Sequence, residues 1–200
     1  MCSPLNHEAT ISHFEENSYY GLAKENIKFF AQGVMPATDF EGNLLLASED
    51  SLALSPNGHG GSLKALIDSG SIKDMADREI QHVSYFQVDN PLVSTINPLF
   101  IGLHDLQKSD MSSRSLTKTG PFEKLGNFVS IGDRISIIEY SDLPEEKALE
   151  KDESGQIKYR AGSPAIHILR RDFIEQFASG EIKLPYCLLY TSPSPRDLWI

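Results

Sequence analysis

The pattern of apolar and polar residues along the chain changes repeatedly between helical spacing and short runs of β-favouring residues. Apolar positions three and four residues apart, as in Leu63, Leu66 and Ile67, are typical of one face of a helix. The pattern predicts a helix that begins near Asn6 or His7, one that ends between 68 and 70, one over 71–77, one that begins at 97–98, and one over 171–178.

Runs of β-branched and aromatic residues predict strands between these helices, at 26–30, 52–54, 82–88, 115–118, 128–131 and 134–140. Residues 159–168 are also strand-like but are interrupted by Gly162-Ser163-Pro164. The run 82–88 is almost continuously apolar, which favours a strand buried on both faces of a parallel sheet. The pair Gly132-Asp133 predicts a hairpin turn between two of the strands. Strands that alternate with helices, followed by a hairpin-rich half, predict an α/β fold with an antiparallel extension.

Residues 54–66 are the stretch around which the chain is organised, because three glycines separate a short strand from a helix. Gly58, Gly60 and Gly61 allow a tight turn and let the backbone approach a ligand closely at a helix N-terminus. The spacing matches neither common phosphate-binding motif, so a turn without a ligand stays the alternative.

Asp89 directly follows the run 82–88 and is the second candidate for chemistry. Open α/β sheets bind ligands at the carboxyl ends of their strands, and a carboxylate there suits a Mg²⁺ ion that carries phosphates. The alternative is an aspartate that caps the turn before Pro91.

Composition and charge narrow the function classes. The chain has 200 residues, 40% of them hydrophobic, which suits one soluble globular domain. A net charge of −10 argues against nonspecific binding of nucleic acid or of anionic membranes, and no apolar run approaches the roughly 18 residues of a membrane span. The acidic pairs near 145 and 152 are expected to be solvated surface.

The C-terminal residues differ in character from the rest. Residues 187–197 read Cys-Leu-Leu-Tyr-Thr-Ser-Pro-Ser-Pro-Arg-Asp, which matches a translated sequencing-library adapter, so we expect 187–200 to be an artefact and exclude it from fold reasoning. Cys2 is then the remaining cysteine. A single cysteine forms no intrachain disulfide, which predicts a reducing, cytoplasmic location.

Several local motifs occur in the order found in one family, and the chain resembles the UDP-sugar pyrophosphorylases, most closely the UDP-N-acetylhexosamine branch. Three of the motifs are Phe29-Phe30-Ala31-Gln32-Gly33, Ser55-Pro56-Asn57-Gly58-His59-Gly60-Gly61 and Gln87-Val88-Asp89-Asn90. The matching stretches lie within 20–27, 29–37, 55–61, 87–93, 97–102, 118–126, 138–142 and 161–167, and Leu184-Pro185-Tyr186 resembles the start of a further one.

The resemblance implies a Rossmann-like nucleotidyltransferase fold of the GT-A type, with a mixed sheet and a β-hairpin extension. It implies the reaction of UTP with a sugar 1-phosphate to give a UDP-sugar and pyrophosphate, with Mg²⁺. Residues 1–186 would be part of the catalytic domain. The sugar phosphate would attack the α-phosphorus of UTP directly, so catalysis would consist of positioning and charge neutralisation.

The resemblance also implies roles for individual residues. Gln32 would hydrogen-bond the uracil edge, Gly58 would bring backbone against the uracil, and His59 would lie beside the nucleotide. Asp89 would hold Mg²⁺ against the α-phosphate. The sugar pocket would contain Gly126, Glu139 and Ser163. For each side chain a purely structural role is the alternative; His167 in particular is expected to make a structural hydrogen bond.

Two departures from the family pattern affect the predicted substrate. Ser163 stands where the family has an asparagine that contacts the acetamido group, and His59 stands where the hexosamine branch commonly has asparagine. Both favour glucose 1-phosphate as the alternative to N-acetylglucosamine 1-phosphate.

The family's first Gly-rich loop would precede Met1, and its catalytic arginine and lysines have no counterpart here. We therefore expect a fragment that is inactive by itself. A non-catalytic nucleotide-sugar-binding protein is the alternative from another function class.

Overall fold

The structure is a computed structural model that describes residues 1–39, 41–180 and 182. The predicted artefact 187–200 and the segment 184–186 lie outside these residues. The described chain divides into two compact units. The first contains Met1–Gln81 and the segment that begins at Arg171, and the second contains His82–Arg170.

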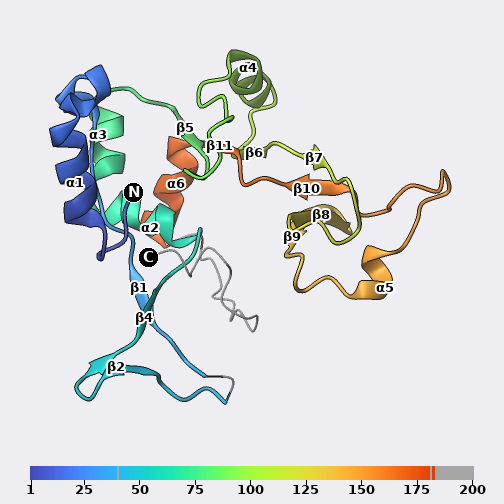
Figure 1. Ribbon diagram of the computed structural model, residues 1–200. Coiled ribbons are helices and arrows are strands. Elements are labelled where there is room, and N and C mark those ends of the chain that lie inside the picture. Colours follow the sequence, from blue (N-terminus) through green and yellow to red (C-terminus); the bar gives the residue numbers. More distant parts are fainter. Residues whose placement is uncertain (40, 181, 183–200) are drawn as a thin grey trace. The chain divides into compact units, whose positions relative to one another are not determined.

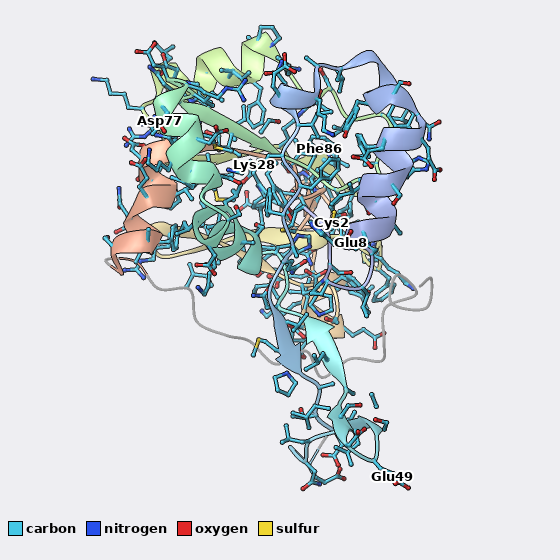
Figure 2. All side chains as sticks on the ribbon, turned by 90° about the vertical axis from the view of Figure 1, so that its left-hand side faces the viewer. Cys2, Glu8, Lys28, Glu49, Asp77 and Phe86 are labelled. Carbon is cyan, nitrogen blue, oxygen red and sulfur yellow. The ribbon has the colours of Figure 1, made fainter. Side chains whose placement is uncertain are left out.

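The first unit combines helices with two narrow antiparallel ribbons (Figure 1). Its helices are α1 (His7–Glu16), η1 (Ser18–Gly21), η2 (Lys24–Asn26), α2 (Gly61–Asp68), α3 (Ser71–Asp77) and α6 (Arg171–Ser179). Its strands are β1 (Val34–Pro36), β2 (Leu46–Ser48), β3 (Ser51–Leu52) and β4 (Leu54–Pro56), with β1 paired to β4 and β2 to β3. Figure 2 shows Glu49 at the tip of the β2–β3 ribbon, far from the helices of this unit.

The core of the first unit lies where α6 packs against α2 and α3. Ile174 of α6 is fully buried, and Ala65, Leu66 and Ile72 from the other two helices are buried with it. The buried residues of α2, Ser62, Ala65 and Leu66, are three and four residues apart, so this helix presents one face to the core.

The second unit contains two antiparallel sheets and two helices. Its elements are β5 (His82–Tyr85), α4 (Pro98–Leu106), β6 (Met111–Ser113), β7 (Leu116–Thr117), β8 (Gly126–Ile131), β9 (Arg134–Ile138), α5 (Glu145–Ala148), β10 (Ala161–Ser163) and β11 (His167–Arg170). One sheet has the order β7-β10-β8-β9 and the other has the order β5-β11-β6. In both, a strand from late in the sequence lies between two strands from earlier in the sequence.

Many predicted elements are confirmed. Helix α1 begins at His7, α2 follows the glycines and ends at Asp68, and α3 covers the predicted 71–77. The side chain of Asn97 caps α4 by accepting a 3.0 Å hydrogen bond from the Phe100 backbone N–H. The hairpin around Gly132 is present between β8 and β9.

The predicted strand 26–30 is wrong. Residues 24–26 form η2 instead, and the extended residues after it make one isolated bridge, between Cys2 and Ala31, within the described chain. β-favouring residues form a strand only where a neighbouring backbone supplies a ladder, and here the neighbour contributes a single residue.

The prediction of a parallel, doubly buried strand at 82–88 is also wrong. Strand β5 ends at Tyr85 and pairs antiparallel with β11, and Val88 beyond it is 96% exposed. An apolar run by itself carries no information about the direction of the neighbouring strand.

His167 makes the predicted structural hydrogen bond, because its Nδ1 lies 2.8 Å from Ser113 Oγ across the β11–β6 pair. A second histidine, His104, is 1% exposed, with Nδ1 2.8 Å from Ser112 Oγ and its ring edge-to-face with His82 at 5.4 Å. Burial lowers the pKa of His104, and the neighbouring His82 and Arg170 lower it further.

Among the described residues, no helix combines the length and the apolar composition that crossing a bilayer requires.

Replacing Ile174 by alanine tests the helical core. We expect Ile174→Ala to lower the free energy of unfolding by about 2–5 kcal/mol, because it leaves a cavity between three helices. Ile135→Ala is the matched control: Ile135 is 79% exposed, so its loss should change stability by about 0.5 kcal/mol or less. Equal losses in urea denaturation of the two variants would contradict the assignment of the core.

The pKa of His104 predicts a pH dependence of stability. The folded-state pKa lies below the unfolded value of about 6.5, so the unfolded chain binds the additional proton first as pH falls. The free energy of unfolding should therefore decrease from pH 7.5 to pH 5.5. His104→Gln should reduce that decrease when urea unfolding is compared at the two pH values; an unchanged decrease would contradict this role for His104.

Candidate functional site

Gln32 lies against the Gly-rich turn in the first unit. Its Nε2 donates to Gly58 O at 2.8 Å and to Asn57 Oδ1 at 3.0 Å. The β1–β4 ladder causes this contact, because Val34 pairs with Pro56 and the Asn57 N–H donates to Gly33 O at 3.1 Å. The ladder thus brings the residue before Gly33 next to the residues after Pro56.

Two glycines make room for the side chain of Asn57. A Cβ on Gly61 would lie 1.8 Å from Asn57 Oδ1, and one on Gly33 would lie 2.8 Å from Asn57 Nδ2. Gly58 has a φ of +75°, which other residues rarely adopt. The space that Asn57 occupies requires glycine at 33 and 61, and the positive φ favours glycine at 58, whether or not a ligand binds.

His59 is exposed at the start of α2, and its carbonyl accepts from the Ser62 N–H at 3.1 Å and from Ser62 Oγ at 2.6 Å. These bonds fix the backbone that leads from the turn into the helix. Neither hydrogen bond involves the imidazole ring of His59.

A cavity of about 540 Å³ lies beside Gln32. Its walls come from the segment Phe29–Met35 and from α2, and they include Gln32, Asn57, Lys64 and Asp68. This volume lies within the range of about 300–1,000 Å³ typical of small-molecule sites. The cavity, the amide and the Gly-rich turn belong to the same unit.

Asp89 is an exposed residue in the turn that follows β5 in the second unit. The Asn90 N–H donates to Gln87 O at 3.2 Å, and Asn90 Oδ1 accepts from the Leu92 N–H at 3.3 Å. Within the described chain, no cluster of three or more His, Cys, Asp or Glu side chains is placed to hold a metal ion.

The three residues assigned to a sugar pocket are adjacent in the second unit. Ser163 of β10 pairs directly with Gly126 of β8, and Glu139 follows Ile138, the partner of Asn127. A Cβ on Gly126 would lie 3.4 Å from Glu139 Oε2 and 3.8 Å from Ser163 Cβ. We call these three residues the strand row. Successive residues of a strand face opposite sides of a sheet, so the register places all three on one side.

Sequence reasoning assigned no role to Asn57, Lys118 or Asn127, although each is tied to a candidate residue. Asn57 binds Gln32, and Asn127 accepts from Lys118 Nζ at 2.7 Å directly beside Gly126. The signal for Asn57 was its place before Gly58. A buried lysine–asparagine pair leaves no recognisable pattern in a sequence.

Comparison with known proteins gives a consistent result. Residues 1–163 match the family model described as UTP–glucose-1-phosphate uridylyltransferase. A probable UDP-N-acetylglucosamine pyrophosphorylase of Schizosaccharomyces pombe is 38% identical over 188 residues, which is 92% of this chain and 40% of the relative. The UDP-N-acetylglucosamine pyrophosphorylase of Saccharomyces cerevisiae is 33% identical over 177 residues, 88% of this chain and 37% of the relative.

The fold is similar to a solved structure as well. The crystal structure of the UDP-N-acetylglucosamine pyrophosphorylase of Trypanosoma brucei in complex with an inhibitor aligns with a TM-score of 0.77 at 25% identity, covering 88% of this chain and 36% of that one. The chain thus spans less than half the length of the relatives that it matches.

Replacing Gly61 by alanine tests the packing of the turn. The new Cβ would displace Asn57 and break its hydrogen bond with Gln32, so we expect a loss of about 1–3 kcal/mol in the free energy of unfolding. Gly102→Ala is the matched control, because Gly102 lies inside α4 with open space around it and alanine should stabilise the helix by roughly 0.5–1 kcal/mol. A stabilising effect of Gly61→Ala in urea unfolding would contradict the arrangement.

Proposed function

Because the chain belongs to the UTP–glucose-1-phosphate uridylyltransferase family, we propose that the complete protein makes a UDP-sugar and pyrophosphate from UTP and a sugar 1-phosphate. It is then an enzyme, a nucleotidyltransferase. Residues 1–186 form part of its catalytic domain, a Rossmann-like domain of the GT-A type.

The strand row is the observation that carries the proposal. Gly126 and Ser163 lie in paired strands and Glu139 directly follows β9, and the resemblance assigned each of them separately to one sugar pocket. A wrong alignment of the motifs would have no reason to bring these three residues together. Their adjacency in the strand register supports a common role.

The reaction is a direct displacement. An oxygen of the sugar 1-phosphate forms a bond to the α-phosphorus of UTP, and the bond to the bridging oxygen of pyrophosphate breaks. Gln32, Gly58 and His59 hold the nucleotide, with the uracil edge against the amide of Gln32 and the backbone of Gly58. Glu139 accepts hydrogen bonds from sugar hydroxyls, and Gly126 lines the sugar pocket beside it. These residues contribute by positioning the substrates.

Asp89 is the proposed metal-binding residue. Its surroundings fit a magnesium ion bound by few protein ligands better than a metal ion coordinated by protein side chains alone. The described residues offer one carboxylate here without further clustered ligands. Mg²⁺ is commonly bound through one or two carboxylates, with phosphate oxygens and water filling the other positions. Asp89, in the turn after β5, would hold the ion, which would neutralise phosphate charge.

N-Acetylglucosamine 1-phosphate is the favoured sugar substrate, because relatives at 31–38% identity are named for N-acetylglucosamine or N-acetylhexosamine. Glucose 1-phosphate is the second candidate. It is favoured by Ser163, whose short hydroxyl side chain stands directly opposite Gly126, and by His59 in the turn.

The proposal is tested with the complete reading frame that contains this chain. Purified protein is assayed for pyrophosphate release from UTP and Mg²⁺, with each of the two sugar 1-phosphates in parallel. Turnover with a higher kcat/KM for N-acetylglucosamine 1-phosphate is expected. A higher value for glucose 1-phosphate would reverse the assigned sugar. UTP binding without turnover of either sugar would favour a non-catalytic nucleotide-sugar-binding protein.

Gln32→Ala tests the nucleotide half of the site in the same assay. Removing the amide should raise KM for UTP about tenfold, the effect of roughly one lost hydrogen bond to the base, with less change in KM for the sugar 1-phosphate. Gln107→Ala, an exposed glutamine at the end of α4, is the matched control and should leave both constants unchanged. A KM for UTP that stays within twofold of wild type would remove Gln32 from the nucleotide site.

A further inference from the structure

Lys118 is a buried lysine whose ammonium group binds neutral oxygens. It is 5% exposed, and its Nζ donates to Asn127 Oδ1 at 2.7 Å and to Pro121 O at 3.2 Å. Burial lowers its pKa, and the Coulombic attraction of Glu123 partly opposes that shift. Burying an ammonium is costly, so its presence here calls for an explanation.

The stem of Lys118 contacts the strand that carries Ser163. A Cβ on Gly162 would lie 3.1 Å from Lys118 Cγ and 2.9 Å from Leu125 Cδ1, so the lysine stem occupies space beside this glycine. The Lys118 backbone N–H also donates to Arg160 O at 2.8 Å, just before β10. Lys118 is thus fixed to β10 at both its backbone and its stem.

The ammonium end of Lys118 reaches the other two strands through Asn127. Asn127 is fully buried in β8, and its Nδ2 donates to Ile138 O of β9 at 3.2 Å. Lys118 therefore contacts β10 through its stem and β8 through its hydrogen bond to Asn127. Asn127 in turn connects β8 to β9 through its own hydrogen bond to Ile138 O.

Three residues in this network, one in each of β10, β8 and β9, are next in sequence to a member of the strand row. Gly162 precedes Ser163, Asn127 follows Gly126, and Ile138 precedes Glu139. Neighbouring residues in a strand project to opposite faces of a sheet, so the network lies behind the strand row. A binding site is accurate only when its supporting residues hold the strands at fixed spacing.

We propose that Lys118 is a positioning residue for the sugar 1-phosphate: by linking β10, β8 and β9 from behind, it fixes the spacing of Ser163, Gly126 and Glu139. This inference rests on the proposed function. It assigns to Lys118 no contact with substrate and no proton transfer.

The test uses the complete protein and the variant Lys118→Met, which keeps a long apolar stem and removes the ammonium. KM for the sugar 1-phosphate should rise about tenfold or more, because Asn127 loses its partner and the spacing of the row relaxes. KM for UTP should stay within twofold, since Gln32, Gly58 and His59 lie in the other unit and Asp89 follows β5, which belongs to the other sheet of the second unit. Lys124→Met is the matched control: Lys124 is exposed in the same loop, and its loss should change neither constant.

A second measurement separates positioning from simple stabilisation. Calorimetric titration should show weaker binding of the UDP-sugar to Lys118→Met and unchanged binding of UDP, which lacks the sugar. Lys118→Gln retains a shorter donor toward Asn127 and should restore part of the lost affinity. If Lys118→Met does not fold, Lys118→Gln carries the test on the same criteria.

The outcomes distinguish the two proposals. Equal losses toward UTP and the sugar 1-phosphate, or no change in either, would overturn the positioning role while wild-type turnover upholds the function. A wild-type protein that neither turns over nor binds UDP-sugar would overturn the proposed function, and with it this inference.

Discussion

Strand β8 has one neighbour on each side, and the register of those two pairings is the constraint on which the candidate sugar site depends. Ser163 opposite Gly126 and Ile138 opposite Asn127 together fix which side chains meet. A shift of one residue in either pairing would move the side chains of one strand to the opposite face of the sheet. The buried Asn127, which needs partners for its amide, makes such a shift costly, since its hydrogen bonds exist in one register only.

The first unit uses a different constraint. There the amide of Gln32 donates hydrogen bonds to Asn57 and Gly58 in the turn. The short β1–β4 ladder brings these residues together, and glycines leave space for the side chain of Asn57. Hydrogen bonds to an amide define orientation, and the bare backbone at Gly58 allows close approach. The turn in the helical unit and the antiparallel sheet in the other unit are thus held by different means, the first by space left at glycines and the second by strand register.

The sequence was informative wherever a local rule determines structure. Pro98 in the first turn predicted a helix start, and Gly132-Asp133 predicted a hairpin, because the chemistry of helix starts and turns acts over a few residues. Strand partners were not predictable in the same way. The residues 26–30 favour strand by composition, yet their neighbour supplies one bridge, and the apolar run at 82–88 pairs antiparallel with a segment eighty residues later. The candidate residues Gln32, Gly126 and Glu139 came from motif resemblance. Lys118 begins one of the matching stretches, but its role, like that of Asn127, emerged only from its contacts.

The strand order of the second unit has a consequence for how the chain folds. Residues 161–170 supply an inner strand to both sheets, β10 between β7 and β8, and β11 between β5 and β6. Until this segment leaves the ribosome, β7 cannot be joined to β8, nor β5 to β6, because the strand between each pair is missing. Among the strands described in the second unit, only β8 and β9, which form a hairpin, can pair before then. Contacts between distant residues form slowly because loop closure costs entropy. Folding of the second unit is therefore expected to be a late, cooperative event that one ten-residue segment triggers.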